Sequence, residues 1–216
     1  MGSVMLIVSL LVTASAVLVA EDRQLPRAVL VYAVQGVGIA LLLLLGANVS
    51  GIHGLMGSAA TVLVAQAGLL PLLVMRYARG GAPADQAPPA MGYLWAGSLA
   101  LLGFLAGEFL LPSLLAGIPD AGAVSYGLGG GLALVAAALW TILGHHDMLK
   151  VVLGVCVLEN GVHLLMAAVA PTIPELAAIG AVLDVIVAIW LLLVVGRRAE
   201  EATGARDDGL LDHLRG

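Results

Sequence analysis

Residues 151–170, VVLGVCVLENGVHLLMAAVA, and residues 175–196, ELAAIGAVLDVIVAIWLLLVVG, are the two apolar segments that decide the fold. Each is long enough to cross a bilayer as a helix, because about 20 apolar residues span the hydrocarbon core. Only PTIP, residues 171–174, separates them. The sequence therefore predicts a membrane hairpin.

Each arm of this hairpin carries one carboxylate near its middle. Glu159 lies twelve residues before Pro171, and Asp184 lies ten residues after Pro174. At about 1.5 Å per residue, both lie roughly 15–18 Å from the turn, close to the midplane of a core about 30 Å thick. An ionisable group is costly at that depth and is by default a functional candidate. We expect Glu159 and Asp184 to relay protons or cations.

The composition agrees with a membrane protein, since 61% of the residues are hydrophobic and only 11% are charged. Soluble domains have about a quarter of their residues charged. The long apolar runs do not alternate, which favours helices over a barrel. No basic block indicates nucleic-acid binding. With one cysteine, Cys156, the chain alone forms neither a disulfide nor an iron–sulfur cluster.

The whole chain is predicted to be an all-α integral membrane protein with about seven transmembrane helices. Five further spans precede the hairpin, at residues 3–20, 28–46, 54–75, 91–111 and 123–144. We divide the chain into a four-helix region (1–122), a three-helix region (123–198) and a polar tail (199–216).

Basic residues indicate the orientation. They fall on alternate predicted loops, at Arg23 and Arg27, Arg76 and Arg79, Lys150, and Arg197 and Arg198. The loops between these have no Lys or Arg. The positive-inside rule then places the N-terminus outside and the C-terminus in the cytoplasm. Lys150 is expected in a loop over residues 145–150, and the neighbouring His145 is expected to be solvated there.

Other intramembrane polar residues are weaker candidates. His163 lies four residues after Glu159 on the same helix face and either exchanges protons or holds its helix by hydrogen bonding. Glu108 lies near the end of its span and is an interfacial carboxylate or part of a secondary polar path. Gln35 and Gln66 are expected to bond between helices, or to belong to that path. No nucleophile, metal or nucleotide motif is present, so we predict no catalytic residue, metal or cofactor.

The hairpin resembles a known family. LGVCVLENGVHLL, PTIPEL and LDVIVAIWLLLVVGRR, within residues 153–198, are similar to the hydrogenase-4 component E family, membrane subunits of energy-converting, complex-I-like hydrogenases. Residues 123–196 further resemble subunit K of respiratory complex I and the C subunit of multisubunit cation/proton antiporters. The resemblance matches Glu159 and Asp184 to membrane glutamates of those proteins, and aspartate is one methylene shorter than the glutamate it replaces.

The resemblance implies a non-catalytic subunit in the cytoplasmic membrane of a bacterium or archaeon. It would translocate protons or sodium ions beside antiporter-like and complex-I-like subunits, while the redox active site lies in its partners. Two alternatives stay open at this point. The chain could be a structural scaffold that bridges larger membrane subunits, or a subunit of a cation/proton antiporter without a redox partner.

Overall fold

A computed structural model describes residues 2–79, 92–117, 127–145 and 148–170, together with the single residues Ile186, Trp190, Leu193 and Val194. The described ranges contain six helices that are long and apolar enough to cross a membrane. Their elements are α1 (Gly2–Glu21), α2 (Leu25–Ser50), α3 (Gly54–Val64) with η1 (Ala65–Leu69) and α4 (Leu70–Arg79), α5 (Tyr93–Phe109) with α6 (Leu111–Leu114), α7 (Gly127–Gly144), and α8 (Met148–Val169).

The prediction of an all-α protein with helices suited to crossing a membrane is therefore confirmed for the described residues, and the six described spans lie close to their expected positions. Asp184 lies outside the described residues, as does nearly all of the predicted seventh span. The seventh helix and the orientation in the membrane stay predictions.

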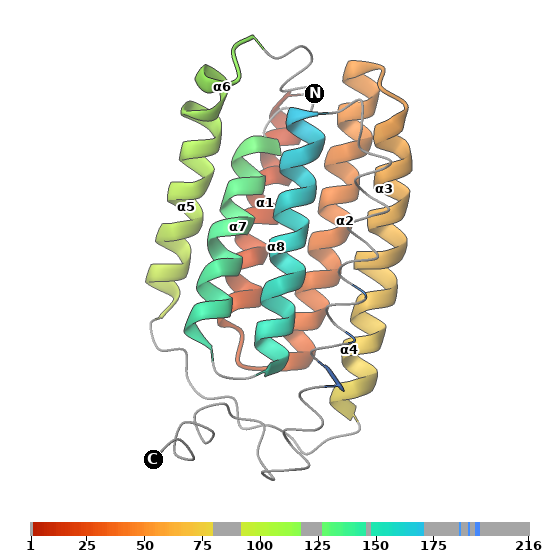
Figure 1. Cartoon of the computed structure of the whole chain (residues 1–216), viewed down its shortest axis with the longest axis vertical. Helices are drawn as coiled ribbons and strands as arrows, with labels where there is room; N and C mark the ends of the chain where they lie inside the picture. The colour runs from red at the N-terminus through yellow and green to blue at the C-terminus, as the bar shows by residue number, and fades with distance from the viewer. Residues whose placement is uncertain are drawn as a thin grey trace.

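Consecutive spans run in opposite directions and form one upright bundle (Figure 1). α7 packs against α5, α1 and α8, and α2 packs against α1, α3 and α8. This alternation brings Arg23, Arg27 and Lys150 to the end of the bundle at which α4 also finishes. We call this end the basic end.

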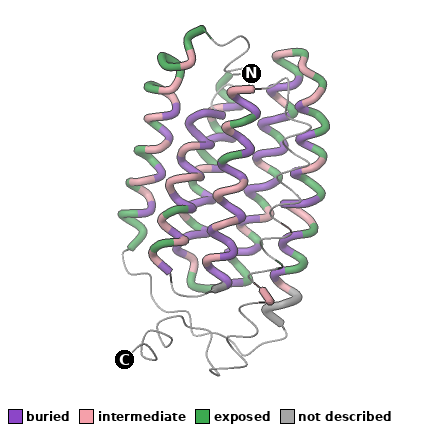
Figure 2. The backbone as a smooth tube through the Cα atoms, viewed as in Figure 1, coloured by how far each residue is buried: buried purple, intermediate pink, exposed green. Residues whose placement is uncertain are grey.

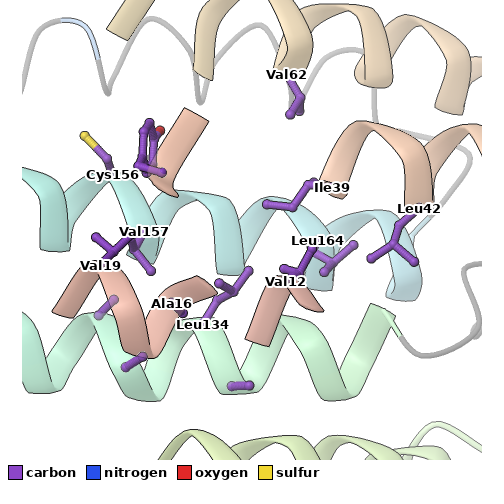
Figure 3. Close-up of a cluster of buried hydrophobic side chains, with 14 of the residues drawn as sticks. Val12, Ala16, Val19, Ile39, Leu42, Val62, Leu134, Cys156, Val157 and Leu164 are labelled. Atoms are coloured by element: carbon purple, nitrogen blue, oxygen red, sulfur yellow. The ribbon is translucent and has the colours of Figure 1, made fainter. Parts of the chain in front are cut away.

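The core lies between α1, α2, α7 and α8. Val12, Ala16 and Val19 of α1 gather with Ile39 of α2 and Leu164 of α8 (Figure 3). α5, at the edge of the bundle, instead has many exposed positions (Figure 2). Leu94 and Phe109 are among its exposed large apolar residues. Such a surface suits lipid or another membrane subunit, because apolar side chains in a bilayer need no burial within the protein.

Glycines allow the closest helix contacts. A Cβ on Gly107 of α5 would collide with the Leu128 carbonyl oxygen of α7, and one on Gly103 would lie 2.7 Å from the Leu132 carbonyl oxygen. A Cβ on Gly161 of α8 would lie 2.8 Å from the Gly131 carbonyl oxygen. Small residues let helix backbones approach in this way inside membranes.

Local sequence explains where the helices begin and bend. α2 begins with a proline in its first turn and ends at Gly51, whose φ of 73° is the left-handed conformation that glycine accepts readily. Pro71 accounts for the π turn, because its ring clashes with a carbonyl one turn earlier and it has no N–H to donate. The Leu70 N–H then donates to the Ala65 carbonyl, five residues back, instead of four.

Two expectations about residues 145–150 were wrong. α8 begins at Met148, so Lys150 lies inside a helix, and its side chain is 2% exposed. His145 is also buried, and its Nδ1 is 3.1 Å from the Thr141 carbonyl oxygen that it can bond. Both side chains find backbone carbonyls at the tightly packed basic end, which the loop prediction did not foresee.

We predict that Gly107→Ala destabilises the protein in detergent by about 1–3 kcal/mol, the usual cost of overpacking. The added methyl group would force α5 away from α7. Thermal unfolding monitored by size-exclusion chromatography measures this. Gly97→Ala is the matched control, because it lies in the same helix and its Cβ would meet nothing within 4 Å. Equal stability of the two variants would contradict the packing described.

Candidate functional site

A chain of buried polar side chains crosses the middle of the bundle. Asn160 of α8 donates from Nδ2 to Gln35 Oε1 of α2 at 3.1 Å. Gln35 Nε2 donates to Ser15 Oγ of α1 at 3.2 Å, and Ser15 Oγ donates to the Val12 carbonyl at 2.6 Å. Gln35 and Asn160 are at most 1% exposed. The expectation that Gln35 bonds between helices is confirmed.

Further polar atoms near this chain have no hydrogen-bond partner among the described residues. They are Asn160 Oδ1, His163 Nε2, Gln66 Oε1 and the Tyr32 hydroxyl, all buried. The Tyr32 hydroxyl lies beside the Asn160 and Cys156 side chains and is close enough to Glu159 to interact with it electrostatically. Buried polar atoms without a protein partner normally bond to internal water. We call Ser15, Tyr32, Gln35, Gln66, Asn160 and His163 the polar layer.

Glu159 adjoins this layer from α8. It lies in the middle of the helix, as expected, and its side chain is half-buried. Its charge acts on the Tyr32 hydroxyl of α2 and on the Cys156 thiol one turn below. His163, one turn above, is only 4% exposed. Glu159 and His163 are thus one turn apart on α8, and Asn160, the residue after Glu159, bonds Gln35. The position of Asp184 relative to them is outside the described residues.

Gln66 lies in the π turn, which packs against the part of α2 that carries Gln35. Ala67, the next residue, lies against Gly36, where a Cβ would be only 3.1 Å from the Ala67 nitrogen. This contact holds η1 against α2 next to Gln35. π turns are rare and often occur at functional sites. Gln66 is 2% exposed, and a bond between helices was expected for it, but none is made by Oε1 to the described residues.

Glu108 lies apart from the layer, at the opposite end of the bundle from the basic end. Its Oε1 accepts the Gly129 N–H at 3.0 Å. Gly129 is in the first turn of α7, where N–H groups lack partners within the helix and negative charge is favourable. Glu108 thus caps α7 from α5, and its role in a secondary path stays a prediction.

A second set of buried polar groups lies at the basic end. Lys150 Nζ donates to the Val19 and Ala20 carbonyls of α1 at 2.8 and 3.3 Å. Glu21, the last residue of α1, is 2% exposed, and its Oε1 accepts Trp140 Nε1–H at 3.1 Å. Glu21 was not singled out from the sequence, because its partner Trp140 is 119 residues away along the chain.

Four long-range contacts cross the predicted boundary between residues 122 and 123. They join Glu108 to Gly129, Glu21 to Trp140, Lys150 to α1, and Asn160 to Gln35. The two predicted regions are therefore packed and hydrogen-bonded together where described. Among the described residues, no group of three or more His, Cys, Asp or Glu side chains is suited to a metal ion.

Three curated proteins are similar to this chain. They are named hydrogenase-4 component E and come from Escherichia coli strain K12, Escherichia coli O157:H7 and Shigella flexneri. Each is 31% identical over 154 residues, which cover 68% of this chain and 68% of the relative. The chain belongs to the hydrogenase-4 component E family. The resemblance inferred from the hairpin residues is thereby confirmed.

The other comparisons add nothing to the family assignment. No family model matches the chain, and no solved structure matches it. The chemistry that this site can perform therefore follows from the side chains it contains. The polar layer offers a carboxylate, an imidazole, a phenol and amides in the interior of an apolar bundle, which are groups that can bind water and pass protons along hydrogen bonds.

We predict that Gln35→Leu and Asn160→Leu are energetically coupled. Each single change leaves a buried amide without its partner, whereas the double change removes both. A double-mutant cycle on thermal unfolding should give a coupling of about 0.5–2 kcal/mol, as measured for polar contacts between membrane helices. A control cycle pairs Gln35→Leu with Ser113→Ala, since Ser113 bonds only to its own helix in an exposed position. A coupling no larger than that of the control would contradict the interhelical bond.

Proposed function

We propose that this chain is a non-catalytic membrane subunit of a hydrogenase-type redox complex related to respiratory complex I. In this proposal its intramembrane carboxylates take part in moving protons or sodium ions across the cytoplasmic membrane of a bacterium or archaeon. Family membership supports the hydrogenase assembly, because the relatives are named as components of a hydrogenase. Six helices suited to crossing a membrane support the location. Antiporter-like and complex-I-like membrane subunits are the proposed neighbours.

The observation that carries the transport proposal is the polar layer beside Glu159. A layer needed only for packing would satisfy its own polar atoms, because each one left unpaired in a buried place costs about 1–3 kcal/mol. Asn160 Oδ1, His163 Nε2 and Gln66 Oε1 instead lack partners among the described residues. Water bound to these atoms would reach the interior of the bundle, and a hydrated interior is what proton transfer requires.

In this proposal each residue has a separate role in proton transfer. Glu159 would accept and release a proton. Its side chain is half-buried, so one part faces the apolar interior and another part faces the outside of the described bundle. Gln35 and Asn160 would hold α1, α2 and α8 in register around the water. His163 would pass protons or orient water one turn above Glu159. Asp184, on the predicted seventh span, would be the second carboxylate of the relay.

A scaffold function is the second candidate, and the glycine contacts favour it. α5, α7 and α8 approach as closely as backbone permits at Gly107, Gly131 and Gly161. The exposed apolar face of α5 is available for another membrane subunit. If the chain only bridges its neighbours, the carboxylates have no role in transport and their amide variants will behave normally.

Replacing Glu159 by Gln distinguishes these functions. The amide keeps the size of the side chain and one hydrogen-bond acceptor, but it neither takes up nor releases a proton in the working pH range. We expect the complex to assemble and to move at least about tenfold fewer ions per turnover, because a positioned acid–base group contributes about 10²–10⁴-fold to proton transfer. The measurement is ion uptake by the complex reconstituted in liposomes, with the redox rate recorded in the presence of an uncoupler.

Asp22→Asn is the matched control for this experiment. It makes the same carboxyl-to-amide change at a position outside the polar layer, where Asp22 only accepts the Gln24 N–H in a turn. Normal ion movement by the Glu159→Gln complex would overturn the transport proposal and leave the scaffold function.

Glu108→Gln tests whether a secondary path passes through α5. The amide oxygen can still accept the Gly129 N–H, so we expect stability within about 0.5 kcal/mol of the unsubstituted protein. Because Glu108 caps α7 and lies apart from the polar layer, ion movement is expected to be unchanged in the same liposome assay. Loss of ion movement without loss of stability would assign Glu108 to the path instead.

A further inference from the structure

Glu21 is a buried carboxylate whose position the proposed relay does not explain. It ends α1 at the basic end of the bundle and is 2% exposed. Oε1 accepts the Trp140 indole N–H of α7 at 3.1 Å. Oε2 is buried and has no hydrogen-bond partner among the described residues. One of the two oxygens is therefore free to carry or receive a proton.

A carboxylate is a poor choice here for stability alone. The last turn of a helix ends in carbonyl oxygens without partners, so negative charge is disfavoured and positive charge favoured there. The protein meets this need with Lys150 of α8, which donates to the Val19 and Ala20 carbonyls. A glutamine at position 21 would keep the bond with Trp140 without bringing a buried charge. An ionisable group retained at such a cost indicates function.

The surroundings of Glu21 come from three other helices. Tyr93 of α5 donates its hydroxyl to the Glu21 carbonyl at 3.3 Å, Trp140 comes from α7 and Lys150 from α8. Asp22 is its neighbour in the chain. His145 is also buried at this end, bonded to the Thr141 carbonyl. Glu21 is thus enclosed, but lies beside the exposed Arg23 where the chain meets water.

The nearest polar groups towards the middle of the bundle belong to the polar layer, and along α1 the buried apolar Ala16 and Val19 separate them from Glu21. Ser15 lies six residues earlier in α1, about 9 Å along the helix axis, and it already bonds Gln35 of the polar layer. The Tyr32 hydroxyl, which lacks a partner among the described residues, is on the basic-end side of Gln35 in α2. A proton exchanged at Glu21 would therefore have to cross this apolar stretch through transient water to reach Glu159.

We propose that Glu21 is a further proton-exchanging carboxylate, placed at the basic end of the path that leads through the polar layer to Glu159. A proton arriving through water forms the O–H bond on Oε2, and the same bond breaks when the proton leaves towards Tyr32 and Ser15; no electrons change hands. Trp140 and Lys150 are positioning residues that hold the carboxyl group and the end of α1. This inference rests on the proposed ion transport.

The test is proton uptake by the reconstituted complex carrying Glu21→Gln, measured per redox turnover beside Glu159→Gln. We expect uptake by Glu21→Gln to fall at least about tenfold, with normal assembly, and Glu21→Asp to keep part of it. Asp22→Asn is the control and should pump normally. Loss of uptake in Glu159→Gln together with normal uptake in Glu21→Gln would overturn this inference alone. Normal uptake in both variants would overturn the proposed function as well.

A second measurement covers the case in which Glu21→Gln does not assemble. A hydrophobic carbodiimide reacts with protonated carboxyl groups in apolar surroundings, so it can be applied to the unsubstituted complex in vesicles and followed by mass spectrometry. We expect Glu21 to be modified, with a rate that falls as the pH of the solution facing the basic end is raised. A rate that does not change with that pH, or no modification at all while Glu159 is modified, would show that Glu21 exchanges no protons and would overturn the inference.

Discussion

Inside a bilayer every polar group must find a partner within the protein or in water that the protein encloses, and this constraint governs the structure. It explains why several hydrogen bonds between helices join residues that are far apart in the sequence. Asn160, Gln35 and Ser15 form one such chain across α8, α2 and α1. Glu108 accepts an N–H at the start of α7, and Lys150 donates to a carbonyl near the end of α1. Where the protein supplies no partner, as at His163 Nε2, we infer water.

Close helix packing and the polar layer depend on each other. The glycine contacts between α5, α7 and α8 bring backbones together with few side chains between them. This holds α8 against α7 on one side while its polar face, with Asn160 and His163, turns towards the rest of the bundle. The π turn adds Gln66 from the third span. A rigid apolar frame around a few polar atoms is a suitable arrangement for enclosing water.

The sequence predicted the helical spans well, because long apolar runs in a bilayer have essentially one regular structure available to them. It also placed Glu159 in the middle of its helix and indicated that Gln35 bonds between helices. It failed at Lys150, His145 and Glu21. Each of these buried side chains bonds to a residue outside its predicted loop: Glu21 to Trp140, His145 to Thr141, and Lys150 to the end of α1. In the case of Glu21, the partner is more than 100 residues away along the chain. Local pattern has no information on such contacts.

The π turn shows a similar limit. Pro71 lies inside the predicted third span, but no bend was predicted from it, and a kink and an inserted residue are both compatible with a proline in a helix. The structure resolves the choice, since the Leu70 N–H reaches back five residues and Gly36 leaves room for Ala67. For Asp184, whose surroundings are outside the described residues, depth in the membrane remains an argument from spacing along the chain.

The most direct test of this account is an electron cryo-microscopy structure, at a resolution that shows water, of the complex that contains this chain, purified from native membranes into lipid nanodiscs. We expect the chain among hydrogenase and antiporter-like subunits, with ordered water bonded to Asn160 Oδ1 and His163 Nε2 and continuing to Glu159. A dry layer, in which these atoms bond only to protein side chains, would contradict the claim that the chain carries part of an ion path.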